Sequence, residues 1–185
     1  MPSHMPRPAV LPAVGTVPRA VPRTAPPPGS PKPARGERPT LLLTGGSGVL
    51  GRALIDELSA DFDLVCLRRN RPLDDPRVRE VKGDLLAPRL GLSPLARYEL
   101  ALQVDVVLHS AAETNWRTPP ETIRRTNTLG TEALIDLASR ADAPLHLVST
   151  AFVASVPSEE DRRRFPGAAA YLDSKIRAEQ MFRES

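Results

Sequence analysis

The chain has 185 residues, one cysteine and a formal net charge of +3, a length that suits one ordinary domain. Residues 1–39 hold six basic residues against one acid, which leaves a net charge of about −2 for residues 40–185 and removes the main support for nucleic-acid binding. The lone Cys66 excludes an intramolecular disulfide and a multi-cysteine zinc site, which fits a cytoplasmic protein. We expect no metal site, and no apolar run is long enough for a membrane span.

The first segment, residues 1–39, carries twelve of the 21 prolines and no aromatic residue. Without hydrophobic periodicity, burial cannot offset the entropy lost on ordering the backbone. We predict a disordered proline-rich tail. It could bind a proline-recognising partner, or it could be a linker or follow from a mis-assigned start codon.

From Thr40 onward, apolar runs alternate with segments of helical periodicity, which is typical of β-α-β units. We therefore predict an α/β domain over residues 40–185, with a doubly wound parallel sheet of the Rossmann type. The expected strands are 40–43, 63–67, 78–81, 104–109 and 145–149, and the expected helices are 49–59, 94–103, 120–140 and 168–183.

A glycine-rich turn, TGGSGVLG over residues 44–51, joins the first expected strand to the first helix. Glycines at this spacing permit a tight turn, close approach of the backbone to a pyrophosphate and helix–strand packing, with the phosphate at the helix N-terminus. A glycine turn can also simply reverse the chain, but the strand-to-helix context favours a dinucleotide site. The residues predicted to bind the cofactor here are Gly45, Ser47, Gly48, Val49 and Gly51.

Arg68 and Arg69 follow the second expected strand, where a carboxylate would bind the ribose of NAD and an arginine accommodates the 2′-phosphate of NADP. The planar guanidinium suits a phosphate, so we expect NADP(H) in preference to NAD(H); alternatively both arginines are part of a solvated loop. After the third strand, Asp84 and Leu85 are predicted to lie at the adenine.

The fourth expected strand ends in His109, followed by three small residues, Ser110, Ala111 and Ala112, that would let the chain lie close to the cofactor. At the end of a buried strand, His109 is more often a hydrogen-bonded structural residue than a catalytic one. Asn127 is a further predicted cofactor contact. Close packing or a kink must offset the cost of Gly130 in its helix, about 1 kcal/mol.

Three polar residues form the predicted catalytic centre. Thr150 follows the fifth strand, while Tyr171 and Lys175 are four apart and therefore share one helix face. A nearby ammonium would lower the pKa of a tyrosine and make it a useful acid at neutral pH. Tyr171 would exchange the substrate proton, Lys175 would tune the tyrosine and hold the ribose, and Thr150 would orient a carbonyl.

Taken in order, these motifs resemble the extended short-chain dehydrogenase/reductases: TGxxGxxG, Gly-Asp-Leu, the Ala-Ala turn, Asn-x-x-Gly-Thr and Tyr-x-x-x-Lys. Four phrases are most similar to the thioester reductase-like branch, which includes reductase domains of carboxylic acid reductases and nonribosomal peptide synthetases, and fatty acyl-CoA reductases. They are GDL with LGLS (83–85, 90–93), HSAA with NW (109–112, 115–116), LVSTA (147–151) and YLDSK through Glu179. Val49 and Ile176 depart from that branch, which commonly has aromatic residues there.

The resemblance implies NADPH-dependent reduction of an acyl thioester, held on a carrier protein or coenzyme A, to an aldehyde or alcohol. Members of that branch continue into a substrate-binding region, so we expect the fold to be truncated before it. Two alternatives stay open. One is an NAD-dependent nucleotide-sugar epimerase or dehydratase, which Arg68, Arg69 and the LGLS phrase argue against; the other is a non-enzymatic dinucleotide-binding module.

Overall fold

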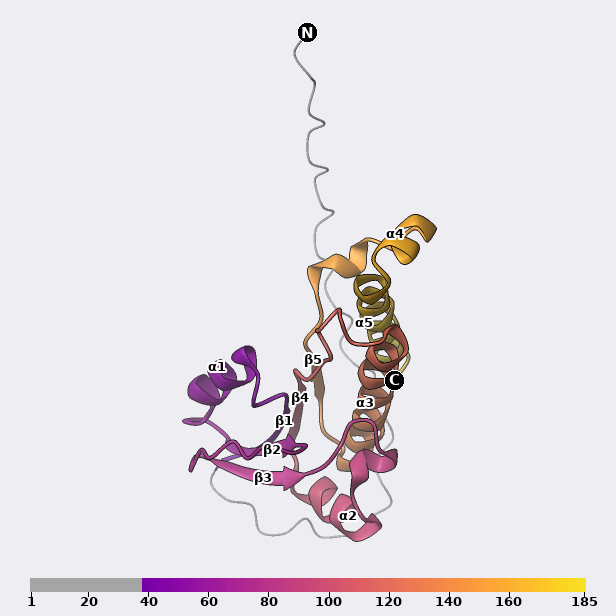
Figure 1. Cartoon of the computed structure of the whole chain (residues 1–185). Helices are drawn as coiled ribbons and strands as arrows, with labels where there is room; N and C mark the ends of the chain where they lie inside the picture. Colours follow the sequence, from indigo (N-terminus) through magenta and orange to yellow (C-terminus); the bar gives the residue numbers. More distant parts are fainter. Residues whose placement is uncertain (1–37) are drawn as a thin grey trace.

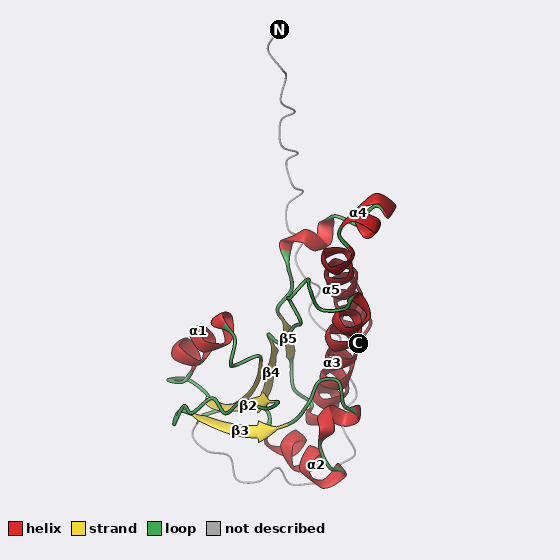
Figure 2. Cartoon of the chain, in the orientation of Figure 1, coloured by secondary structure: helices red, strands yellow, loops and turns green. Residues whose placement is uncertain are grey.

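The computed structural model describes residues 38–185, so the predicted tail lies outside the described residues apart from its last two. Strands and helices alternate along the chain (Figures 1 and 2). The strands are β1 (Thr40–Thr44), β2 (Asp63–Arg68), β3 (Val78–Lys82), β4 (Val106–His109) and β5 (Leu145–Leu147). The helices are α1 (Val49–Leu58), α2 (Pro94–Gln103), α3 (Pro120–Ala141), α4 (Glu159–Arg164) and α5 (Pro166–Glu184), with 3-10 turns η1 (Pro88–Gly91) and η2 (Ala151–Ala154).

All five strands belong to one parallel sheet in the order β3-β2-β1-β4-β5. The chain builds outward from β1 to β3, then crosses to the other side of β1 to add β4 and β5. The strand order therefore reverses between β1 and β4. Ligands of open α/β sheets bind at such a switch point, beyond the carboxyl ends of the strands. The predicted doubly wound Rossmann-type sheet is confirmed.

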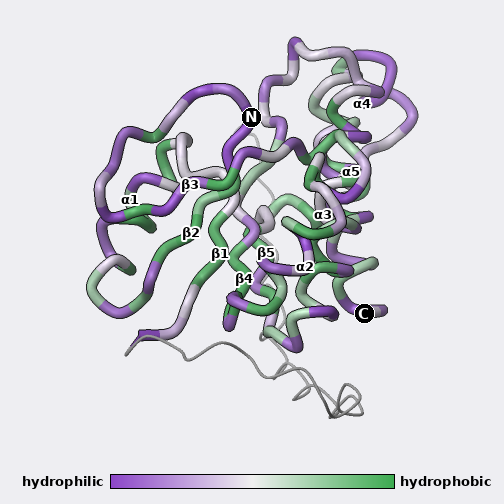
Figure 3. Tube along the Cα trace, turned by 90° about the horizontal axis from the view of Figure 1, so that it is seen from below, coloured by the Kyte–Doolittle hydropathy of each residue, from purple (hydrophilic) through white to green (hydrophobic). Residues whose placement is uncertain are grey.

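The sheet has a hydrophobic core on each face, because successive side chains of a strand point to opposite faces. Leu42 packs into the core beneath α2 and α3, whereas Leu41 and Leu43 pack with Ile55 of α1 on the other face. Figure 1 shows α1 on one side of the sheet and α2, α3 and α5 on the other. Hydrophobic stretches of β1, β2 and β4 run through the middle of the molecule (Figure 3).

Element boundaries differ from the prediction where a cap or a short helix intervenes. β4 begins at Val106 and not at 104, because Val104 ends α2 with its N–H bonded to the carbonyl of Leu100 at 3.1 Å. β5 is shorter than expected and ends at Leu147. We did not predict α4, although its capping box between Ser158 and Asp161 is a recognisable helix start.

Candidate functional site

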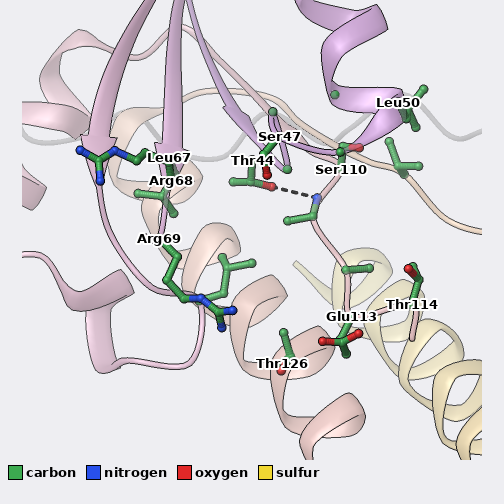
Figure 4. A pocket seen from close by; sticks show the side chains of 18 of the residues that line it. Thr44, Ser47, Leu50, Leu67, Arg68, Arg69, Ser110, Glu113, Thr114 and Thr126 are labelled. Carbon is green, nitrogen blue, oxygen red and sulfur yellow. Dashed lines mark hydrogen bonds between the residues drawn. The ribbon is translucent and has the colours of Figure 1, made fainter. Parts of the chain in front are cut away.

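A cleft of about 950 Å³ opens at the carboxyl ends of the strands (Figure 4). Its walls come from segments far apart in the sequence: the glycine turn after β1, the loop after β2, the turn after β3, the small residues after β4, and α5. Most of the predicted site residues line it: Gly45, Ser47, Gly48, Val49, Gly51, Arg68, Arg69, Asp84, Leu85, Ser110, Ala111, Ala112, Tyr171 and Lys175. The fold therefore brings these motifs together.

The glycine turn is packed so closely that side chains are excluded at two positions. Gly45 has φ +80°, and a Cβ there would lie 2.8 Å from the amide nitrogen of Ala111. A Cβ on Gly51 would lie 2.1 Å from the carbonyl oxygen of Gly45. The N-cap of α1 is Gly48, which supplies no side-chain cap, so the N–H groups of the first turn from Val49 onward have no capping side chain beside the cleft. This geometry fits an anionic phosphate group.

The two predicted arginines differ in their surroundings. The Nε of Arg68 donates to Oε2 of Glu80 on β3 at 2.7 Å. Arg69 is exposed at the rim of the cleft, together with Asn70 and Arg71, which we did not predict as site residues. The sequence does place a third basic residue two positions after Arg69, and that spacing was the available signal.

Asp84 and Leu85 follow β3 and line the cleft. Oδ1 of Asp84 accepts a hydrogen bond from the N–H of Leu86 at 2.9 Å, which shapes the turn. Leu85 also accounts for Gly130 of α3, since a Cβ at that glycine would lie only 3.0 Å from Cβ of Leu85. The expected close packing at Gly130 is confirmed.

His109 is a buried structural residue, only 2% exposed, as the sequence indicated. Its Nδ1 lies 2.7 Å from Oγ1 of Thr44, and its Nε2 lies 3.2 Å from Oγ1 of Thr131. The Thr131 hydroxyl donates to the carbonyl of Asn127, so it can only accept from Nε2–H. The Thr44 hydroxyl then donates to Nδ1 while accepting from the N–H of Ala111 at 3.2 Å. This network ties the small-residue turn to β1 and α3.

The three predicted catalytic residues are arranged differently from our expectation. Lys175 is buried and its Nζ donates to the carbonyl of Val148 at 2.6 Å. Burial raises the pKa of Tyr171 above its ordinary value, whereas we expected the ammonium to lower it. Burial also lowers the pKa of Lys175, which Glu179 partly opposes. Thr150 is the N-cap of η2, where its Oγ1 accepts from the N–H of Phe152 at 3.4 Å, and it is not among the described residues that line the cleft.

Asn127 is buried behind the wall of the cleft. Its Oδ1 accepts from the N–H of Glu113 at 2.7 Å, and its Nδ2 donates to Oγ of Ser174 on α5 at 2.9 Å. Ser174 in turn donates to the carbonyl of Tyr171 at 2.6 Å. Asn127 therefore connects the segment after β4 to the helix that carries Tyr171.

Several residues of the site were missed by sequence reasoning. Glu113, Thr114, Thr126 and Ser149 line the cleft, and Ser149 donates its hydroxyl proton to Glu179 of α5. Within residues 38–185, no three His, Cys, Asp or Glu side chains gather in a way that could hold a metal ion. In the same part of the chain, every helix is too short or too polar to cross a membrane.

Comparisons with known proteins agree with this geometry. The family model NAD_binding_4, described as male sterility protein, matches residues 68–185. The terminal R domain from the myxalamid PKS-NRPS biosynthetic pathway superposes with a TM-score of 0.67 at 31% identity, over 82% of this chain and 47% of that one. The reductase (R) domain of a nonribosomal peptide synthetase from Mycobacterium tuberculosis gives a TM-score of 0.61 at 30% identity, over 80% and 45%.

A curated relative, the polyketide synthase-nonribosomal peptide synthetase ffsA of Aspergillus flavipes, is 35% identical over 124 residues. The match covers 62% of this chain but 3% of the synthetase, and the chain spans less than half of either solved reductase domain. The resemblance read from the motifs is confirmed. The chain belongs to the NAD-binding male sterility protein family, in the thioester reductase-like branch of the extended short-chain dehydrogenase/reductases.

Proposed function

We propose that residues 40–185 form the cofactor-binding domain of an NADPH-dependent reductase that acts on an acyl thioester. One observation carries the proposal: a single cleft is lined by the glycine turn, the arginines after β2, Asp84, the Ala111–Ala112 turn and the Tyr171/Lys175 pair. Backbone N–H groups at the start of α1 and the guanidinium groups of Arg68 and Arg69 at the end of β2 suit the pyrophosphate and 2′-phosphate of a dinucleotide. Bound NADPH would supply a hydride.

The chain's own residues supply the remaining chemistry. Tyr171 donates the proton that the carbonyl oxygen of the thioester needs as its carbon gains the hydride. Lys175 holds positive charge in the wall of the cleft beside the ribose position. Thr150 would orient the substrate carbonyl from the N-cap of η2, next to Ser149, which lines the cleft. The resulting hemithioacetal loses its thiol as the C–S bond breaks, which yields an aldehyde. A second reduction would give the alcohol.

The substrate thioester is proposed to be attached to a carrier protein or coenzyme A. Two similar solved domains support this: one is the terminal R domain of a PKS-NRPS biosynthetic pathway, and the other is a reductase domain of a nonribosomal peptide synthetase. Asn127 belongs to the proposed site as a residue that orients the Tyr171 helix through Ser174, and not through a direct contact with the cofactor.

Binding calorimetry with NADPH and NADH tests the cofactor assignment. The full chain should bind NADPH more tightly, and Arg69→Ala should weaken NADPH by about tenfold while leaving NADH nearly unchanged. Arg163→Ala removes the same charge from the exposed surface of α4 and serves as the control. Absence of binding to either cofactor would overturn the proposal, and a clear preference for NADH would favour the epimerase or dehydratase alternative.

Turnover of an acyl-coenzyme A thioester with NADPH tests the reaction. Conversion by the wild type that is lost in Tyr171→Phe would support a reductase and exclude a non-enzymatic binding module. A wild-type chain that binds NADPH but converts no thioester would favour the binding module.

A further inference from the structure

The last residue of β2 and the loop that follows it present three arginines to one end of the cleft. Arg68, Arg69 and Arg71 all line the cleft, and Figure 4 labels the first two beside the end of β2. We call residues 69–73 the arginine loop. A loop carrying free cations would be a poor binding site if it were loosely held, since binding would then have to order it. The contacts at the two ends of the arginine loop therefore decide whether it is ordered before a ligand binds.

One carboxylate fixes both ends of the arginine loop. Oε2 of Glu80 accepts from Nε of Arg68 at 2.7 Å, just before the loop. Oε1 of the same side chain accepts from the backbone N–H of Leu73 at 2.9 Å and of Asp74 at 3.3 Å, where the loop ends. The bond from Leu73 is the largest of the effects that hold the pKa of Glu80 below its ordinary value. The negatively charged side chain of Glu80 therefore holds both ends of the arginine loop in place.

Burial of Leu73 adds a second anchor. Leu73 is 9% exposed and packs in the core with Ile55 and Cys66. Its Cδ2 would lie 3.3 Å from a Cβ on Gly46, so the end of the loop packs beneath the glycine turn. As a result the loop that carries the arginines and the turn proposed to hold the pyrophosphate form one packed unit.

The charges around the arginine loop leave two cations for a ligand. The Nε of Arg68 is paired with Glu80, and the guanidinium of Arg77 is paired with Asp75 at 2.6 Å and with Asp56 at 2.8 Å. Arg69 and Arg71 are exposed, and neither forms an ion pair within the described residues 38–185. Two guanidinium groups two positions apart suit a phosphate monoester dianion, which offers several oxygen acceptors.

We propose that Glu80 is a positioning residue that presents Arg71, together with Arg69, to the 2′-phosphate of the dinucleotide and thereby sets the preference for NADPH over NADH. The inference rests on the proposed function, because it assigns a discriminating role at the same cleft. Glu80 does not contact the phosphate; it acts through the backbone of Leu73 and Asp74 and through Arg68.

Calorimetric titrations with NADPH and NADH test the two assignments on the full chain. Arg71→Ala should weaken NADPH by about tenfold and NADH by less than about twofold. Glu80→Ala should lower the NADPH/NADH affinity ratio by about fivefold, because the hydrogen bonds that hold the two ends of the arginine loop are lost. Glu80→Gln keeps an acceptor for Leu73 and should lower the ratio less. Arg163→Ala is again the charge control, and circular dichroism checks the fold of each variant.

The sign of the Glu80 effect separates positioning from simple electrostatics. If Glu80 acted only as a negative charge near the phosphate, its removal would raise the preference for NADPH. A ratio that rises or stays constant in folded Glu80→Ala overturns the positioning role, and equal weakening of both cofactors in Arg71→Ala overturns the phosphate contact. Wild-type binding to neither cofactor would instead refute the proposed function.

Discussion

Acidification should destabilise the fold through His109. Burial lowers the pKa of its imidazole from 6.5 to about 3, and the network with Thr44 and Thr131 requires the neutral ring, with Nδ1 accepting and Nε2 donating. In the unfolded chain the imidazole regains its ordinary pKa. The unfolded state therefore binds more protons between these two values, and the free energy of unfolding falls as the pH is lowered through that window.

The size of the effect follows from the two pKa values. Integration of the proton linkage from pH 7 down to about pH 5 gives a loss of about 2 kcal/mol from this one residue, rising to about 3 kcal/mol at about pH 4. Such a loss is a large part of the stability of an ordinary domain, about 5–15 kcal/mol. Carboxylates held in ion pairs add to this loss of stability at lower pH. One is Asp75, whose pKa is lowered by its hydrogen bonds to Arg77.

Urea unfolding at a series of pH values measures this contribution. His109→Gln removes the titrating ring and should lower stability at neutral pH, but its stability should fall by about 2 kcal/mol less than that of the wild type between pH 7 and about pH 5. His146→Gln is the matched control, because that side chain is exposed on β5. Equal acid slopes for the wild type and His109→Gln would refute the reasoning.

Three further predictions follow from single contacts. Gly51→Ala should lower the free energy of unfolding by about 3 kcal/mol or more, measured in urea, since its Cβ would lie 2.1 Å from the carbonyl oxygen of Gly45; a loss below about 1 kcal/mol would contradict that contact. Ser93→Ala removes the cap that accepts from the N–H of Ala96 and should cost about 1 kcal/mol in the same assay, whereas unchanged stability would show that the cap contributes nothing. Tyr171→Phe should bind NADPH within about twofold of the wild type in calorimetry but turn over thioester at least about a hundredfold more slowly; comparable turnover would exclude its role as the acid.

The sheet and most of the cleft could be predicted because both depend on local patterns. The alternation of apolar runs with helical periodicity predicted which segments form the strands and helices of a parallel sheet, and the glycine spacing predicted the turn where Gly45 adopts φ +80°. Ser93 and Pro94 gave the start of α2 correctly. Errors arose at β5 and α4, where the elements are only three and six residues long and too short to show a period.

Side-chain partners across the sequence were the part that local patterns could not supply. Glu80 lies twelve residues from Arg68, and Asn127 lies 47 residues from Ser174, so neither pair shares a helix face or a turn. The Tyr171/Lys175 spacing did predict a shared cleft, but not that Lys175 would donate to Val148 or that burial would raise the pKa of Tyr171. A sequence motif thus predicts on which element, and on which face of it, a residue lies. The contacts that the residue makes depend on partners from other elements, as the pairs Glu80–Arg68 and Asn127–Ser174 show.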